Sequence, residues 1–486
     1  MAATVAAAPR SNQDPGVTSR RHRSWVIPLA AAVVMVLYAA SAVLSAGDQW
    51  GSDFHRRRAG AIAEGPLDIR PVPAELRTLP DPYDAGSNLD VRVDGDVQDL
   101  AYRDGRLYSA HGLTIPLLLV PSELAFGTSP PNWVITLVAA CAGVAAAAWT
   151  LAQVRQRFLC NLPDWTTAAA VAAVGLCGPM WVVVSVGNGY EAAVAVGFAL
   201  SMIGAALLLR STERLGSTDP DCSLERARAA AGSAVLGLAV GARPTMVVTA
   251  ILLAVVAAAV VARRGSRPTA SVIADILAVA GPFVVVGIGI AVANAVRFGS
   301  PTEFGFGFQL SGWDMTTYPQ GRLSYLAPNL LDHVAAVPGH RPSFPWITLR
   351  PTIGGDRPSV HTSEPMIGLI FSAPVLVVGA AATLSSGRAP WARVRGLGTA
   401  VAAAAATGAL LLVLVSWPFN TSSLRYTADG APLLLLAAAG AWLTVRSDAP
   451  LASRTGAATG GRRLDRAWVV ALAVGIAVTA AVQVPV

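Results

Sequence analysis

The stretch SWVIPLAAAVVMVLYAASAVLSAGDQWGSDFH (Ser24–His55) joins a long apolar run to the start of an acidic segment. The apolar part, residues 25–46, is long enough to cross the hydrocarbon core of a bilayer, which takes roughly 20 residues of helix. A polar tail with four arginines, residues 1–24, precedes it. The run is longer than the core of a signal peptide and has no convincing cleavage motif. We therefore expect an uncleaved first membrane span with its tail in the cytoplasm, where arginine-rich segments stay.

The whole chain has the composition of a membrane protein. Of its 486 residues, 53% are hydrophobic and 13% are charged, and the mean hydropathy is +0.53. This composition is not that of a soluble protein, and it predicts an all-α polytopic membrane protein with about 11 spanning helices, within a range of roughly 10–12. The candidate spans are residues 25–46, 131–154, 165–186, 190–210, 229–242, 245–262, 271–296, 365–384, 397–417, 430–446 and 467–484.

Arginine supplies all 36 basic side chains, because the chain contains no lysine. With the N-terminus inside, 21 of these 36 arginines fall in segments that we expect on the cytoplasmic side. The net charge of +7 is then a topology signal, and no nucleic-acid partner is expected. The pattern predicts a multi-pass protein of a bacterial plasma membrane, in contact with membrane lipids.

Two long segments are expected on the outer face of the membrane, residues 47–112 and 297–364. The first should contain helices that lie on the membrane surface. Both segments interrupt a membrane domain over residues 25–446. A cytoplasmic loop and a last membrane helix would follow within residues 447–486.

Two parts of this topology stay open. The stretch 229–262 contains Gly241-Ala-Arg243-Pro244, which implies either a tight hairpin of two short passes or a broken element. Arg243 inside the membrane would need a partner, because an unpaired guanidinium in hydrocarbon costs several kcal/mol. The apolar stretch 111–126 is interrupted by two prolines and is either a surface helix or a short twelfth span.

The outer segment Gly47–Gly112 holds twelve of the 29 acidic residues. Asp48 and Asp53 lie closest to the end of the first span, at the membrane surface. A carboxylate that is partly shielded from water can act as a base on a hydroxyl group at the interface. Alternatively, Asp53 is a solvated loop residue or a helix cap. The residues alone favour this second interpretation.

The end of that segment carries aromatic and charged side chains at short intervals. Tyr102, Tyr108 and His111 are suited to stack on sugar rings, while Asp99 and Arg106 are suited to bond hydroxyl or phosphate groups. The alternative is an amphipathic helix on the membrane, with its tyrosines at the level of the headgroups. Periodicity alone favours this second interpretation.

Two arginines sit at the outer ends of expected spans. Arg297 either clamps a lipid-linked phosphate or extends to a lipid headgroup. Arg425, beside Tyr426, either holds an anionic leaving group or forms an internal ion pair with Asp429. No spacing of ligand residues supports a divalent metal site, and no cofactor is expected. Because a P-loop needs a lysine, an activated sugar would have to arrive on a lipid.

Six motifs occur in order along residues 25–446. They are DLAYRDGRLYS (Asp99–Ser109), GYEA (Gly189–Ala192), GLAVGARPT (Gly237–Thr245), RFGSPTEFG (Arg297–Gly305), EPMIGLIF (Glu364–Phe371) and Arg425-Tyr426 three residues before Asp429. Together with the long outer loop after the first span, they resemble a bacterial branch of the GT-C superfamily of integral membrane glycosyltransferases. That superfamily includes protein O-mannosyltransferases and the aminoarabinose transferases of lipid A.

The resemblance implies a polyprenyl-phosphate sugar donor, an outward-facing active site and inversion at the sugar carbon. The acceptor would be an envelope glycan, lipid or protein. The resemblance assigns the catalytic base to Asp53, with Asp48 as second choice, although this chain has separated acids where family members often have a pair. The donor phosphate would be held by Arg425 and Arg297, and the substrate by Asp99, Tyr102, Arg106, Tyr108, His111 and Tyr426.

Two other functions fit a chain of this kind. One is a transporter or flippase for lipid-linked sugars, and the other is a non-catalytic membrane assembly partner. Transporters usually bury charged residues in the middle of spans and show repeat symmetry. We find no internal repeat, and the acidic residues favour a loop, so a glycosyltransferase is the function that we expect.

Overall fold

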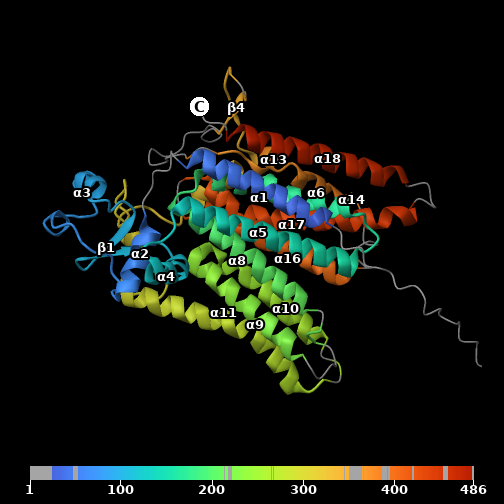
Figure 1. Ribbon diagram of the computed structural model, residues 1–486, viewed down its shortest axis with the longest axis horizontal. Coiled ribbons are helices and arrows are strands. Elements are labelled where there is room, and N and C mark those ends of the chain that lie inside the picture. Colours follow the sequence, from blue (N-terminus) through green and yellow to red (C-terminus); the bar gives the residue numbers. More distant parts are fainter. Residues whose placement is uncertain are drawn as a thin grey trace, which may run out of the picture.

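The computed structural model describes residues 25–46, 53–212, 214–216, 222–263, 265, 267–343, 345–349, 364, 366–385, 391, 394–418, 421–452 and 458–483. This part of the chain consists mainly of helices, with two antiparallel sheets of two strands each. Long helices lie side by side, and a smaller group of short helices and strands gathers at one end of them (Figure 1).

The elements of the first half are α1 (Val26–Ser45), α2 (Phe54–Glu64), the 3-10 helix η1 (Glu75–Arg77), α3 (Leu89–Asp94), β1 (Leu100–Arg103), β2 (Arg106–Ser109), α4 (Thr114–Phe126), α5 (Asn132–Phe158), α6 (Asp164–Leu176), α7 (Met180–Val186), α8 (Gly189–Ser211) and α9 (Ser223–Ala242). The second half contains η2 (Pro244–Thr249), α10 (Ala250–Ala262), α11 (Thr269–Phe298), η3 (Phe306–Phe308), α12 (Leu323–Ala335), β3 (Gly339–His340), β4 (Ile347–Thr348), α13 (Leu369–Ser372), α14 (Val375–Ser385), α16 (Arg395–Ser416), α17 (Leu424–Ala452) and α18 (Ala458–Ala481).

The predicted all-α polytopic fold is confirmed, and the protein is a multi-pass membrane protein. In the described part of the chain, eight helices are long and apolar enough to cross a membrane, or nine if the bent pair α6–α7 forms one span. The predicted number of about 11 spans is not confirmed. Two predicted spans are missing from the count of nine. Residues 229–242 belong to α9, which begins with the charged sequence SLERAR, and residues 365–384 form the short helices α13 and α14.

The predicted span 165–186 is broken in the middle. Helices α6 and α7 meet at an angle of 46°. Gly178 lies at the break with φ +87°, a conformation that glycine adopts without steric cost. Its N–H donates to the carbonyl of Ser372 at 3.0 Å. The break is therefore tied to the end of α13, and its backbone donor is satisfied inside the protein.

Small residues allow α16 and α17 to approach closely. A Cβ atom added to Gly430 would lie 2.4 Å from the carbonyl oxygen of Gly408 on the facing helix. Contacts between small residues are typical of helix pairs in membranes. Because α17 begins with Leu424-Arg425-Tyr426, this packing determines where Arg425 stands at the end of the helices.

The first of the two segments that we expect on the outer face folds into a compact group, here called the outer unit (residues 53–112). Its core consists of apolar side chains with at most 1% exposure, namely Phe54, Ile69, Leu76, Val97, Leu100, Leu107 and, from the second outer segment, Leu310. Helix α2 follows the first membrane helix and lies in contact with α4 and β2. The outer unit therefore sits directly on the ends of the membrane helices (Figure 1).

Residues 100–109 form a β-hairpin, so the interpretation of this stretch as an amphipathic helix is wrong. The turn residues Asp104 and Gly105 have φ +51° and +73°. Positive φ at both positions is the geometry of the two-residue hairpin turn that Asp-Gly favours. Tyr102 pairs with Leu107, and Ala101 pairs with Tyr108. The two tyrosines therefore point to opposite faces of the hairpin.

The second outer segment extends this hairpin. The N–H of Asp99 donates to the carbonyl of Leu310, and the N–H of Leu310 donates to the carbonyl of Leu100, both at 2.8 Å. The two outer segments, which are about 200 residues apart in the chain, thus share backbone hydrogen bonds. This junction places Asp99 against residues of both segments.

Candidate active site

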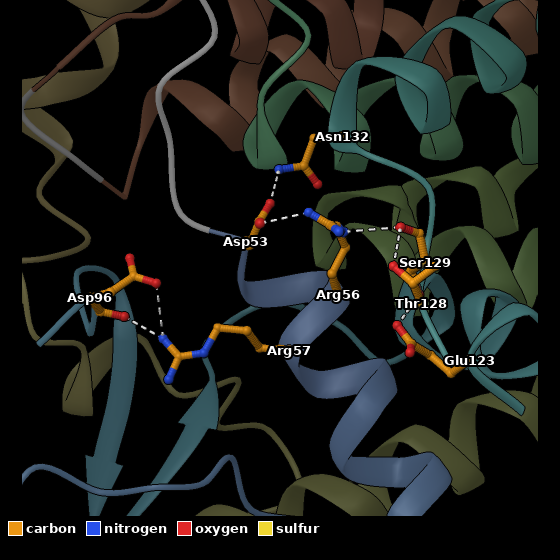
Figure 2. Close-up of polar contacts among 8 residues, drawn as sticks. All are labelled: Asp53, Arg56, Arg57, Asp96, Glu123, Thr128, Ser129 and Asn132. Carbon is orange, nitrogen blue, oxygen red and sulfur yellow. Dashed lines mark hydrogen bonds and ion pairs between the residues drawn. The ribbon is translucent and has the colours of Figure 1, made fainter. Parts of the chain in front are cut away.

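Asp53 stands immediately before α2. Its carboxylate accepts hydrogen bonds from Nη1 of Arg56 at 2.7 Å and from Nδ2 of Asn132 at 3.3 Å (Figure 2). The side chain is 44% exposed and does not cap the first turn of α2. The helix N-terminus favours a negative charge at this position. An accessible carboxylate held by two side chains can accept a further proton donor. Asp48 lies outside the described residues.

Arg56 links Asp53 to the turn between α4 and α5. Its Nε donates to the carbonyl of Ser129 at 3.2 Å, and the hydroxyl of Ser129 donates to Glu123. Figure 2 also shows Arg57, the next residue, paired with Asp96 at 3.5 Å. Helix α2 is therefore held on two sides by ion pairs and hydrogen bonds.

An aromatic layer begins at Phe54, the residue after Asp53. Phe54 stacks on His111 with ring centroids 4.0 Å apart and meets the edge of Tyr190 at 5.5 Å. His111 and Tyr190 meet edge to face at 5.1 Å. Burial lowers the pKa of His111 well below its usual value, so the ring is neutral at pH 7. Phe54, the residue after Asp53, thus contacts His111, which lies far from it in the sequence.

Asp99 contacts the same tyrosine. Its carboxylate accepts hydrogen bonds from the hydroxyl of Tyr190 and from the side-chain amides of Gln98 at 3.0 Å and Gln309 at 3.1 Å. Burial raises the pKa of Asp99, although these hydrogen bonds and the charge of Arg425 oppose the shift. Asp99 is therefore an enclosed carboxylate with donors from three separate segments.

Arg425 lies in the first turn of α17, above the ring of Tyr190. Its guanidinium carbon is 4.4 Å from the centroid of Tyr190 and 5.5 Å from that of Tyr426. Its Nη2 donates to the carboxylate of Glu364. Among the described residues, no acceptor bonds its Nε or Nη1. A guanidinium with donors to spare above aromatic rings is suited to bind an anion.

Asp429 is paired with Arg243 and not with Arg425. The Nε of Arg243 lies 2.6 Å from Oδ1, and its Nη2 donates to Oδ2 at 2.9 Å. The hydroxyl of Thr245 adds a third contact at 3.0 Å. The expectation that Arg243 needs a partner is confirmed. Helix α9 ends at Ala242 and η2 begins at Pro244, so Arg243 lies at the junction of two separate helices.

The structure separates several other residues that the sequence analysis grouped. Tyr102 packs in the core of the outer unit, and Arg106 is exposed to solvent. Tyr108 points to the other face of the hairpin and meets the edge of Phe298 at 5.7 Å. Only Asp99, His111 and Tyr426, of the six expected substrate residues, lie around Tyr190 and Arg425.

Arg297 uses all three of its nitrogens inside the protein. Its Nε donates to the carbonyl of Ala293 at 3.1 Å, Nη1 to the carbonyl of Ser109 at 3.3 Å, and Nη2 to Oδ1 of Asn294 at 2.6 Å. These bonds join the end of α11 to the end of β2. Arg297 therefore holds the hairpin on the membrane helices.

Three residues of this site were not found by sequence reasoning from residue types. Tyr190 and Glu364 lie within the quoted motifs GYEA and EPMIGLIF, so the motifs contained a signal that was not assigned a role. Gln309 had no signal, because only the pairing of the two outer segments brings it to Asp99. Within the described residues, no three His, Cys, Asp or Glu side chains are grouped to hold a metal ion.

No family model matches the sequence, and no curated protein does. Solved structures with a similar arrangement include the apo oligosaccharyltransferase of Archaeoglobus fulgidus, with TM-score 0.45 and 15% identity over 95% of this chain. ArnT from Cupriavidus metallidurans bound to undecaprenyl phosphate has TM-score 0.42 and 15% identity over 94% of this chain. Both belong to the GT-C superfamily that the motifs resemble.

The chain spans 56% of the length of the oligosaccharyltransferase and 76% of that of ArnT. Because both TM-scores lie below 0.5, the likeness does not by itself assign an activity to this protein.

Proposed function

We propose that this protein is a membrane glycosyltransferase. It would transfer a sugar from a polyprenyl-phosphate donor to an envelope glycan, lipid or protein. The reaction would take place on the outer face of a bacterial plasma membrane, with the N-terminus of the chain in the cytoplasm. The supporting observation is that Tyr190 contacts Arg425, Asp99 and Phe54, the residue after Asp53, where the outer unit meets the membrane helices.

The proposed reaction is a single displacement. The oxygen of an acceptor hydroxyl attacks the anomeric carbon while the bond from that carbon to the phosphate oxygen breaks. The hydroxyl proton passes to the carboxylate of Asp53, and the polyprenyl phosphate leaves with one additional negative charge. Attack opposite to the leaving group inverts the configuration of the sugar carbon.

Arg425 is the residue that we propose for the leaving phosphate. It has donors that are not bonded to the described residues, whereas each nitrogen of Arg297 is bonded within the protein. A cation positioned where charge develops lowers the barrier of the reaction. The rings of Tyr190 and Tyr426, both close to the guanidinium of Arg425, offer apolar surface for a sugar ring.

The exposed carboxylate of Asp53 is suited to act as the base, and the enclosed carboxylate of Asp99 is suited to orient Tyr190. Asp53 is within reach of an incoming hydroxyl because almost half of its side chain is accessible. Asp99 accepts a hydrogen bond from the hydroxyl of Tyr190 and thereby sets the direction of that ring. We therefore give Asp53 the proton transfer and Asp99 the positioning of Tyr190.

The test uses the full chain in liposomes with a panel of radiolabelled polyprenyl-phosphate sugars and an envelope extract as acceptor. Transfer by the unmutated protein is expected, and Asp53→Asn should slow it by about 10²–10⁴-fold, the usual contribution of a general base. Asp96→Asn is the matched control, because Asp96 pairs with Arg57 of the same helix and is well exposed.

Three outcomes would contradict the proposal in different ways. Activity of Asp53→Asn equal to that of Asp96→Asn would remove the base assignment. Absence of transfer across the panel, with movement of the labelled lipid between leaflets, would identify a flippase. Absence of both would leave an assembly partner.

A further inference from the structure

An apolar cavity of about 330 Å³ lies among the membrane helices. Its walls come from the second halves of α5 and α8, from α10, and from the facing parts of α16 and α17. Most of the side chains that line it are leucine, valine or alanine. Its volume is at the lower end of the range of ligand pockets, roughly 300–1,000 Å³. None of the proposed catalytic steps uses this cavity.

Two arginines line one end of the cavity. Arg157 is in the last turn of α5, and Arg263 directly follows α10. Both guanidinium groups donate to the carbonyl of Thr212, Arg157 through Nη2 at 3.4 Å and Arg263 through Nη1 at 2.9 Å. In the described part of the chain, Arg263 pairs with no carboxylate. The shared acceptor brings two positive charges together at the end of an apolar space, which is here called the basic cavity.

This charged end lies far from the proposed site of the leaving phosphate. Helix α8 contains Tyr190 in its first turn and is followed by Thr212. Its 23 residues make it about 35 Å long, close to the roughly 30 Å of the hydrocarbon core of a bilayer. Helices α5 and α8 run away from the outer unit (Figure 1). Arg157 and Arg263 therefore lie at the level of the lipid headgroups on the opposite side of the membrane.

The basic cavity is accessible from outside the helices. Thr399 of α16 lines it and is exposed, as is Arg263. Val255 and Val256, which form its wall on α10, are only half-buried. A chain-like apolar ligand can therefore enter from the bilayer between α10 and α16.

A neighbouring cavity provides a comparison within the same helices. It has a volume of about 760 Å³, is lined by residues of α14, α16 and α17, and shares Thr399 and Val401 with the basic cavity. Among the described residues that line it, none is charged. Both cavities are apolar, but charge complementarity to an anionic headgroup is a property of the basic cavity.

We propose that the basic cavity binds an anionic phospholipid of the surrounding membrane. An acyl chain occupies the apolar part, and the phosphate of the headgroup is bound by Arg157 and Arg263. Basic pockets between membrane helices are suited to anionic headgroups, and the planar fork of arginine matches the oxygens of a phosphate. The proposal concerns binding alone, so it does not depend on the sugar-transfer reaction.

The experiment measures thermal unfolding of the full chain after delipidation in dodecyl maltoside. Dioleoyl phosphatidylglycerol is titrated into the micelles and compared with dioleoyl phosphatidylcholine, which has the same acyl chains and no net charge. We expect a saturable rise of Tm with both lipids, because a ligand that binds only the folded state stabilises it. Phosphatidylglycerol should reach half of its effect at the lower mole fraction, because its headgroup is anionic.

Variants of the headgroup end assign this preference to the basic cavity. Arg263→Gln should raise the mole fraction of phosphatidylglycerol at half effect by about fivefold, the usual effect of one basic side chain near an anionic headgroup. Its response to phosphatidylcholine should not change. Because Arg263 is exposed, its replacement leaves the packing of the helices intact. Arg463→Gln, an exposed arginine of α18 that does not line the cavity, is the matched control.

A second pair of variants tests the apolar part. Ala404 lines the basic cavity, whereas Ala402, on the same helix, lines the neighbouring cavity. Ala404→Phe fills the space for the acyl chain, so the preference for phosphatidylglycerol should be lost. Ala402→Phe adds the same side chain outside the basic cavity and should keep the preference.

Two results would overturn the proposal. One is an equal response of the unmutated protein to the two lipids, or a preference for phosphatidylglycerol that persists in Arg263→Gln. The other is a response to undecaprenyl phosphate that Arg263→Gln weakens more than the response to phosphatidylglycerol, which would assign the cavity to a polyprenyl carrier.

Discussion

Asp53 and Asp99 belong to the same outer unit, but their surroundings differ. Asp53 is bonded to Arg56, three residues along the chain, and is 44% exposed. Asp99 is bonded to Gln309 and Tyr190, which come from distant segments, and burial raises its pKa. The solvent access of Asp53 follows from its place next to a membrane span, which the sequence shows. The raised pKa of Asp99 follows from the distant segments that enclose it.

The largest expected effect tests which of the two carboxylates accepts the proton. Asp53→Asn should lower kcat/KM for sugar transfer by about 10²–10⁴-fold. Asp99→Asn should lower it by about tenfold, the effect of one weakened hydrogen bond to Tyr190. Measured initial rates with the same donor give both values. If Asp99→Asn lost more kcat/KM than Asp53→Asn, the base would be the enclosed Asp99 and not the exposed Asp53.

Asp429 sharpens the comparison, because it is an enclosed carboxylate that has an arginine partner. Asp429→Asn leaves the buried guanidinium of Arg243 without its counter-charge, and such a loss costs about 3–5 kcal/mol of stability. Thermal or denaturant unfolding in detergent measures this cost. The double variant Arg243→Met with Asp429→Leu should recover much of the loss. Equal destabilisation by the single and double variants would contradict the ion-pair explanation.

Arg425 tests whether the enclosed side of the site takes part in the chemistry. Arg425→Gln removes the charge that faces the leaving phosphate, so kcat should fall by about 10²–10³-fold. Arg425→Lys should lose less, because the charge is kept. Arg77→Gln, an exposed arginine of the outer unit, serves as control. A change in KM alone, with kcat maintained, would show that Arg425 binds the donor without stabilising the transition state.

The smallest effect concerns the acidity of Asp99. Its pKa is raised in the folded protein above the ordinary value of 3.8, so the folded state holds the proton more tightly than the unfolded state does. Stability from this group is therefore present at low pH and is lost as pH rises from 3.8 through the raised pKa. Asp99→Asn should lack this loss. The measurement is the free energy of unfolding of both proteins across this pH range. If the two values changed in parallel, Asp99 would not be enclosed.

Much of the fold was predictable because membrane helices are encoded locally. A run of apolar residues such as 25–46 has few alternatives to a spanning helix, since every backbone group must be bonded within the membrane. The predicted count of about 11 is not confirmed, because α9 begins with charged residues and because residues 165–186 and 365–384 are apolar but interrupted. The break at Gly178 and the short helices α13 and α14 depend on packing against other helices.

The site was predictable only in part. The sequence indicated Asp99 and His111 as substrate residues and Arg425 as a phosphate ligand, and it indicated that Arg243 needs a partner. It placed Tyr102 and Tyr108 with His111, but a hairpin turns the two tyrosines to opposite faces. The Asp104-Gly105 pair was the local signal for that hairpin, and residue spacing suggested a helix in its place.

The sequence by itself determined that this protein crosses the membrane many times and carries an acidic segment after its first span. Both follow from composition within short windows, because transfer into the bilayer depends on each segment's own hydrophobicity. Only the tertiary structure decided which acids are enclosed and which arginines are paired. Those properties depend on contacts between segments far apart in the chain, and burial there changes the energy of a charge.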